Sequence, residues 1–158
     1  MGVAAETRPG LHEAQMPTVV VLEDEPLERT AIEDALDEFH INNPRVPRHA
    51  IITGSSIKQV TDKFDEHAVD QVRIQPVDPR WIQLVILDLE LETTTGTRTI
   101  KAVKELHWPN AKILVVASPT GGNFHEDTLQ AGADDILQKP FELTEFDKKV
   151  NELLTKVA

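Results

Sequence analysis

The chain has 158 residues, of which 40% are hydrophobic, and its formal net charge is −11. This length suits one domain with a real core, and the acidic balance argues against direct nucleic-acid binding, which needs a basic surface. The lack of cysteine excludes disulfides and thiolate metal sites. No apolar stretch is long enough for a membrane span or for a signal peptide, so we expect a cytoplasmic protein without membrane contact.

The N-terminal part combines an irregular leader with a first strand and helix. Residues 1–16 contain glycine and proline without clear periodicity, so we expect a flexible leader. The apolar run 18–22 predicts a buried strand that ends in Glu23 and Asp24. Pro26 is suited to a first helical turn, and apolar residues at helical spacing then predict a helix to about Phe39.

The next two elements are a strand over 46–53, with Pro47 favouring an edge position, and a helix near 57–64. The apolar residues of 65–80 recur at neither the helical nor the strand spacing, so we expect an insertion here. It could be a longer helix or a short extra strand, and either a passive surface excursion or a docking surface.

The rest of the chain alternates regularly between strands and helices. The expected elements are a strand over 81–87 before Asp88, a helix over 97–107, a strand over 112–117 before Ser118, a helix over 126–131 closed by Gly132, a strand over 135–138 before Lys139, and a final helix from about Thr144. Five β-α units in this order predict an α/β fold, a doubly wound five-stranded parallel sheet with helices on both faces.

Each predicted strand of the central sheet is followed by a polar side chain. Because the carboxyl ends of parallel strands share one edge, where ligands bind, we expect Glu23, Asp24 and Asp88 to converge there. Carboxylates that close repel one another, and a bound Mg²⁺ removes the conflict. An ionised Asp88 can then attack phosphorus, while Lys139 offsets charge and Ser118 donates a hydrogen bond. The alternative is a set of acidic strand ends that simply face solvent.

Taken together, Glu23-Asp24, Asp88, Ser118 and Lys139-Pro140-Phe141 resemble the response-regulator receiver domain of two-component signalling. The resemblance runs from about Pro17 to the C-terminus, so we expect a receiver domain over 17–158. It implies a flavodoxin-like fold, with Asp88 as the phosphoacceptor. It also implies a Mg²⁺ site formed by Glu23, Asp24, Asp88 and the backbone carbonyl of Glu90.

Several positions depart from the family pattern. Counting forward from Asp88 places the family's hydroxyl at Ser118, whereas counting back from Lys139 places it at Ala117; we prefer Ser118. Ile136 stands where the family often has an aromatic residue, so a ring that swings inward on phosphorylation is unavailable. The six histidines show no metal-ligand spacing and are interpreted as surface residues.

The resemblance implies a signalling domain rather than an enzyme, with only self-phosphorylation and self-dephosphorylation chemistry. Its partners would be a sensor histidine kinase or phosphotransfer protein and a downstream protein target. Contact would run through the last two helices and the last strand, a face that could also form a homodimer. The chain ends just after the final helix, so we expect a single-domain receiver or the receiver of a longer protein.

Two other functions compete with this interpretation. A pseudo-receiver scaffold would keep the fold without phosphotransfer, and Ile136 together with the uncertain hydroxyl position favours it. A haloacid-dehalogenase-type phosphohydrolase also uses an aspartate after an apolar strand. That family places its nucleophile on the first strand and expects Asp-x-Asp, whereas Asp88 follows the third strand and position 90 is Glu90.

Overall fold

The computed structural model describes residues 17–66, 77–88, 96–118 and 124–155. In chain order the elements are β1 (Thr18–Leu22), α3 (Pro26–Asn42), β2 (Ala50–Gly54), α4 (Ile57–Glu66), the 3-10 turn η2 (Pro79–Trp81), β3 (Ile82–Asp88), α5 (Gly96–Glu105), β4 (Lys112–Ala117), α6 (Phe124–Ala131), β5 (Asp135–Gln138) and α7 (Leu143–Thr155). The predicted leader 1–16 lies outside the described residues.

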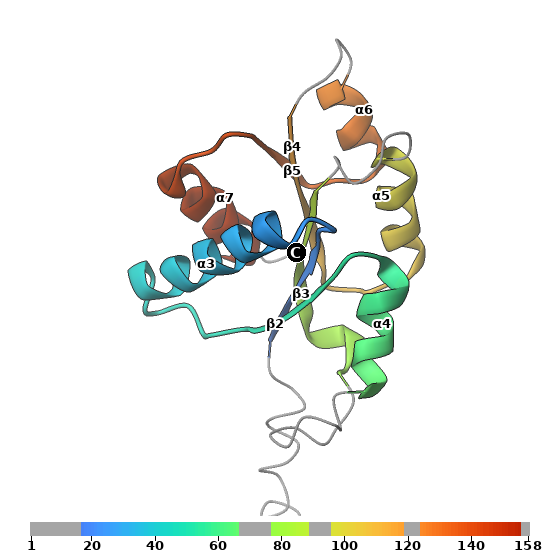
Figure 1. The fold of residues 1–158 in the computed structure, drawn as a ribbon, viewed down its shortest axis with the longest axis horizontal. Coiled ribbons are helices and arrows are strands. Elements are labelled where there is room, and N and C mark those ends of the chain that lie inside the picture. The colour runs from blue at the N-terminus through green and yellow to red at the C-terminus, as the bar shows by residue number, and fades with distance from the viewer. Residues whose placement is uncertain (1–16, 67–76, 89–95, 119–123, 156–158) are drawn as a thin grey trace, which may run out of the picture.

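Within the described residues, five strands form one parallel sheet in the order β2-β1-β3-β4-β5. Helices α3 and α7 cover one face, and α4, α5 and α6 cover the other (Figure 1). The predicted doubly wound sheet is therefore confirmed. None of the helices in the described part of the chain is both long and apolar enough to span a membrane.

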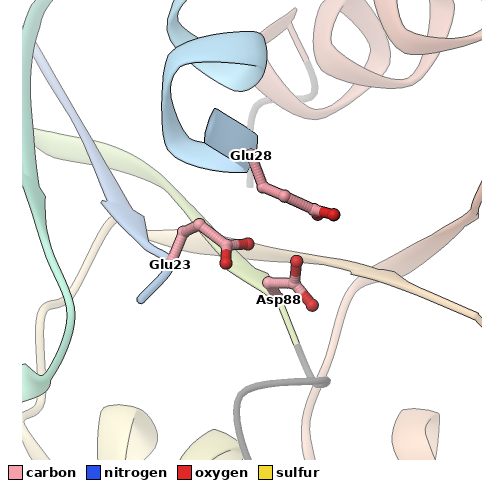
Figure 2. A group of neighbouring side chains, drawn as sticks. All are labelled: Glu23, Glu28 and Asp88. Atoms are coloured by element: carbon pink, nitrogen blue, oxygen red, sulfur yellow. The ribbon is translucent and has the colours of Figure 1, made fainter. Parts of the chain in front are cut away.

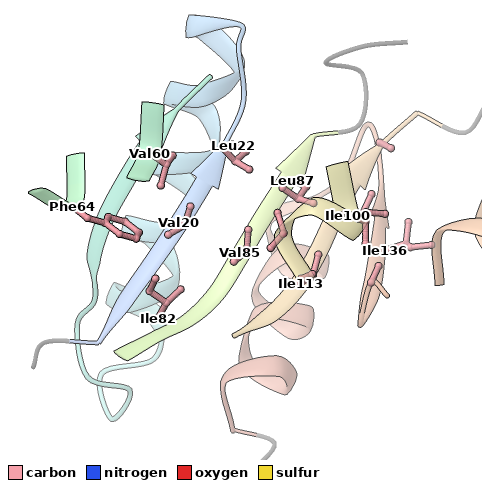
Figure 3. Packing of buried hydrophobic residues seen from close by; sticks show 14 of the residues in the cluster. Val20, Leu22, Val60, Phe64, Ile82, Val85, Leu87, Ile100, Ile113 and Ile136 are labelled. Atoms are coloured by element: carbon pink, nitrogen blue, oxygen red, sulfur yellow. The ribbon is translucent and has the colours of Figure 1, made fainter. Parts of the chain in front are cut away.

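The core consists of two apolar layers, one on each face of the sheet. Along β1, Val19 and Val21 pack toward α3 and α7, whereas Val20 and Leu22 pack toward α4 and α5 (Figure 3). Strands buried on both faces must be apolar at nearly every position. This requirement explains why continuous apolar runs, rather than alternating ones, identified the central strands correctly.

Strand β2 lies at the edge of the sheet, as Pro47 predicts, but it begins at Ala50 rather than at position 46. Its pairing with β1 starts where Ala50 lies opposite Thr18. Proline has no backbone N–H to donate to a strand ladder, so pairing starts only beyond Pro47.

The predicted insertion over 65–80 is described only at its two ends. Helix α4 continues to Glu66, and residues 67–76 lie outside the described part. At the far end Val77 is buried in the core, and Asp78 caps the η2 turn by accepting from the Arg80 backbone N–H at 2.9 Å. The insertion therefore returns to the core immediately before β3, and its role stays a prediction.

The interpretation of all six histidines as surface residues is wrong for His40 and His49, which are 6% and 7% exposed. The His40 Nδ1 lies 3.0 Å from the Leu36 carbonyl oxygen, and its Nε2 lies 3.0 Å from the His49 Nδ1. The His49 Nε2 lies 3.1 Å from the Gln83 Oε1. Buried imidazoles are stable when their nitrogens have partners, and this chain of contacts supplies them.

This buried pair generates a prediction about acid stability. Burial lowers the pKa of His49 below its usual 6.5, against the opposing hydrogen bond from Gln83. The stability that neutral His49 contributes is present above pH 6.5 and is lost as the pH falls through its lower folded pKa. Urea titrations should therefore show the wild type losing more stability than His49→Gln on acidification. The difference can reach at most about 1.4 kcal/mol per pH unit.

The exposed His125→Gln is the matched control and should keep the wild-type pH dependence. Equal pH dependence in the wild type and His49→Gln would contradict the prediction.

Candidate functional site

The polar residues that end the strands meet at the carboxyl edge of the sheet. Asp88 is the last residue of β3, and Glu23, Ser118 and Lys139 directly follow β1, β4 and β5. Parallel pairing keeps these strand ends close to level with one another, because the one register shift between β1 and β3 falls between Thr18 and Val19, at the opposite end of β1. The carboxyl edge therefore brings together polar side chains from the ends of four different strands, as the sequence predicts.

Lys139 links two carboxylates at this edge. Its ammonium donates to Asp88 Oδ2 at 2.5 Å and also to Glu28 Oε1. The side chain of Asp88 is only 1% exposed, and that of Lys139 is 15% exposed. A buried carboxylate is costly without a partner of opposite charge, and Lys139 supplies that partner for Asp88.

Glu23 is held in place by hydrogen bonds to both its backbone and its side chain. Its backbone N–H donates to the Gly54 carbonyl at 3.0 Å, and its carbonyl accepts from Arg29 at 2.9 Å. Its Oε2 accepts from the Glu25 backbone N–H at 3.0 Å. The other oxygen, Oε1, is buried and has no hydrogen-bond partner among the described residues. That orphaned oxygen requires either a proton on the carboxyl group or a ligand.

Burial and neighbouring charged groups at this edge shift the pKa values of Glu23 and Lys139. Burial, followed by the hydrogen bond that a protonated Glu23 makes with Asp88, raises the pKa of Glu23 to about 8. Burial alone would lower the pKa of Lys139, but its hydrogen bonds to Asp88 and Glu28 outweigh burial and raise that pKa above its ordinary range. At neutral pH the site therefore keeps Lys139 charged and, without a cation, favours a proton on Glu23.

The carboxylates of Glu23, Glu28 and Asp88 could hold a metal ion, since one oxygen from each lies within 4.8 Å of the others (Figure 2). Oxygen donors of this kind are the ligands that Mg²⁺ prefers. Three ionised carboxylates beside one ammonium leave two negative charges in excess, which a divalent cation would cancel. The orphaned Oε1 of Glu23 is a further reason why the residues present fit a cation.

The other predicted metal ligands are placed differently. Asp24 is exposed and lines a hollow beside the starts of α4 and α5, together with Ser55 and Arg98. It is not part of the cluster that Glu23 forms with Asp88. Glu90 falls in the segment 89–95, outside the described residues. The roles of Asp24 and Glu90 therefore stay predictions.

The geometry distinguishes the two candidates for the hydroxyl position. Ala117 is 1% exposed and packs into the apolar layer that faces α4 and α5. Ser118 is half-buried and lines a hollow of about 490 Å³ that Glu28 and Lys139 also line. In the register of β3 with β4, Asp88 lies opposite Val116, so Ser118 is two residues further along on the same face. Of the two, only Ser118 lines the hollow beside Lys139, and its assignment as the hydroxyl residue stays a prediction.

Glu28 was missed at the sequence level, where it belongs to the polar face of the first helix. The helix begins at Pro26, directly after the carboxyl end of β1, and Glu25 caps it by accepting from the Leu27 backbone N–H. A residue in that first turn is thus held above the edge of the sheet. Figure 2 shows the Glu28 side chain directed from α3 toward Asp88. The signal that could have identified it is a helix that starts only four residues after the strand ends.

The chain is similar to known proteins in family, sequence and fold. The model of the response regulator receiver domain matches residues 19–151. The chain is 26% identical over 139 residues to the fimbriae Z protein of Salmonella typhimurium, with 87% of this chain and 56% of that protein covered. The chain thus spans about half the length of this curated relative.

Solved structures with the same fold include several receiver proteins. A putative pilus assembly-related protein from Burkholderia pseudomallei superposes with a TM-score of 0.65 at 15% identity, covering 92% of this chain and 94% of that one. The chemotaxis protein CheY4 of Vibrio cholerae superposes with a TM-score of 0.61 at 18% identity, covering 88% of this chain and 99% of that one. At these identities the structural matches establish the fold alone.

The raised pKa of Glu23 predicts that Mg²⁺ binding releases a proton. Without metal, Glu23 is protonated in the fold up to about pH 8 but ionises near 4.5 when unfolded. Its contribution to stability is therefore full below pH 4.5 and is lost as the pH rises through 8. At about pH 7 we expect close to one proton released per Mg²⁺, and at about pH 9 almost none. Calorimetry in buffers of different ionisation enthalpy measures this number.

Glu23→Gln should release no proton at either pH, because its amide cannot ionise. Glu38→Gln is the matched control: it changes an exposed residue on α3, the helix that follows Glu23, and it should release protons as the wild type does. A wild type that binds Mg²⁺ at neutral pH without proton release would contradict the assignment.

Proposed function

Because this chain belongs to the family of response regulator receiver domains, we propose that it is the phosphoacceptor receiver of a two-component phosphorelay. It takes a phosphoryl group from a histidine kinase or phosphotransfer protein onto Asp88. The observation that carries the proposal is the buried Asp88 at the carboxyl edge, with the Lys139 ammonium 2.5 Å from its Oδ2. Receiver domains are signalling domains, and the chemistry proposed for this one is confined to its own phosphorylation and dephosphorylation.

The chemical step is a displacement at phosphorus. An Asp88 carboxylate oxygen attacks phosphorus, and the bond from phosphorus to the imidazole nitrogen of the donor breaks, which leaves an aspartyl phosphate. During the transfer the Lys139 ammonium contacts one phosphoryl oxygen and offsets its charge, and Ser118 donates a hydrogen bond to another. Glu23, Asp88 and, as the family pattern implies, Asp24 and Glu90 would hold Mg²⁺, which would offset charge on the transferring group.

The output of the domain is contact with a downstream protein in the cytoplasm. The proposed face consists of α6, β5 and α7, where Leu129 is 40% exposed. Phosphorylation shifts an equilibrium between two packings of this face. Ile136 is 7% exposed in the core and cannot supply an aromatic rotamer change (Figure 3). The response therefore depends on Ser118 and the chain between it and α6.

The direct test is the intact mass of the protein after exposure to acetyl phosphate and Mg²⁺. The wild type should gain one phosphoryl mass, whereas Asp88→Asn should fold and gain none, because an amide is not a nucleophile toward phosphorus here. Asp34→Asn, an exposed change of the same kind on α3, should label as the wild type does. Equal labelling of the wild type and Asp88→Asn would refute Asp88 as the acceptor. No labelling of the wild type would favour a pseudo-receiver.

Ser118→Ala separates phosphorylation from the conformational response. The variant should still label, because Asp88 and Lys139 remain, but it should lose the coupling from the phosphoryl group to α6. Amide hydrogen exchange with and without beryllofluoride, a phosphoryl mimic, measures that coupling. We expect a change in α6 protection in the wild type and at most a small fraction of it in the variant. An equal response in both proteins would show that Ser118 is not the coupling residue.

A further inference from the structure

The proposed function does not account for Glu28. Its Oε1 accepts from the same ammonium that Asp88 uses, so Lys139 is held between two carboxylates. One of these partners is 1% exposed and the other 42% exposed. The buried partner is the proposed acceptor, and the more exposed one lies on the hollow that Ser118 and Lys139 also line. Glu28 is therefore the more accessible of the two carboxylates that hold the Lys139 ammonium.

A purely structural role does not explain why Glu28 contacts Lys139. An acidic residue in a first helical turn interacts favourably with the helix dipole, and α3 has Glu28 there. That interaction does not require contact with Lys139, which belongs to another element 111 positions along the chain. The ion pair itself is partly exposed and contributes little to stability. Its position beside Asp88, rather than its strength, is the feature to be explained.

We propose that Glu28 is a positioning residue that holds Lys139 against Asp88 and so slows phosphoryl arrival. The proposal rests on the function assigned above and deepens it. Before transfer, Lys139 must exchange its contact with Glu28 for one with a phosphoryl oxygen. The Glu28 carboxylate also lies within 4.8 Å of an Asp88 oxygen, so it repels the anionic group that binds there. Both effects act in the same direction, against phosphorylation.

The alternative role for Glu28 is that of a Mg²⁺ ligand, and the two roles predict opposite signs. If Glu28 holds Lys139, then Glu28→Gln removes one of the two carboxylates that hold the ammonium and also a repelling charge, so the site accepts a phosphoryl group more readily. If Glu28 binds the metal, the same change weakens Mg²⁺ binding and slows phosphorylation. Glutamine keeps the length of the side chain, so the comparison isolates its charge.

The experiment compares wild type and Glu28→Gln by three measurements: the rate of labelling by acetyl phosphate, the affinity for beryllofluoride, and the affinity for Mg²⁺ alone. We expect labelling roughly tenfold faster and beryllofluoride binding tighter by a similar factor, the size expected for one partly screened charge at this distance. Mg²⁺ affinity should fall by no more than a similar factor, because only the charge of Glu28 and not a direct contact acts on the metal, so labelling is compared at saturating Mg²⁺. Glu38→Gln, which removes an exposed charge from the same helix, should match wild type.

Each result has a defined meaning. Slower labelling with weaker Mg²⁺ binding overturns the proposal and makes Glu28 a metal ligand. Unchanged labelling and unchanged beryllofluoride affinity overturn it as well, while leaving Asp88 as the acceptor. A wild type that neither labels nor binds beryllofluoride overturns the proposed function together with this inference. A urea titration that gives similar stability for Glu28→Gln and wild type excludes altered folding as the cause of any difference.

Discussion

The contact between Lys139 and Asp88 is the interaction on which the site depends. Parallel pairing places the ends of β3 and β5 at one edge, although β4 lies between them. The ammonium reaches across that strand to a carboxylate that is almost completely buried. Without it, Asp88 would be a buried charge beside two other carboxylates, an arrangement that proteins avoid by protonation or by binding a cation. The raised pKa of Glu23 follows first from its burial and then from its hydrogen bond with Asp88.

The negative charge of the carboxylates at this edge can therefore be balanced in two ways. Without a metal ion, a proton on Glu23 and the Lys139 ammonium together balance the negative charge at the edge. With a divalent cation the proton is no longer needed, and the orphaned oxygen of Glu23 becomes available as a ligand. A phosphoryl group on Asp88 would demand a further shift, because Lys139 has to leave Glu28. This coupling of metal, proton and phosphoryl group is what would make the edge a switch.

Much of the fold could be predicted because parallel strands buried on both faces leave a clear sequence signal. The runs before Glu23, Asp88 and Ser118 are almost entirely apolar, so both the strands and the polar residues at their ends were identified. Features that depend on tertiary contact were not. Glu28 looks like any polar helix residue until α3 is docked at the edge. His40 and His49 are polar by type, and they can be buried because their ring nitrogens contact each other, the Leu36 carbonyl and Gln83.

The role of the Lys139–Asp88 contact in phosphoryl capture is tested most directly by a crystal structure of the protein with Mg²⁺ and beryllofluoride. This role predicts beryllium bonded to a carboxylate oxygen of Asp88, with the Lys139 ammonium on a fluorine atom and no longer on Glu28. The metal ion should then lie beside Glu23 and Asp88. Beryllofluoride bound elsewhere, or a Lys139 still held between Asp88 and Glu28 with the mimic in place, would contradict it.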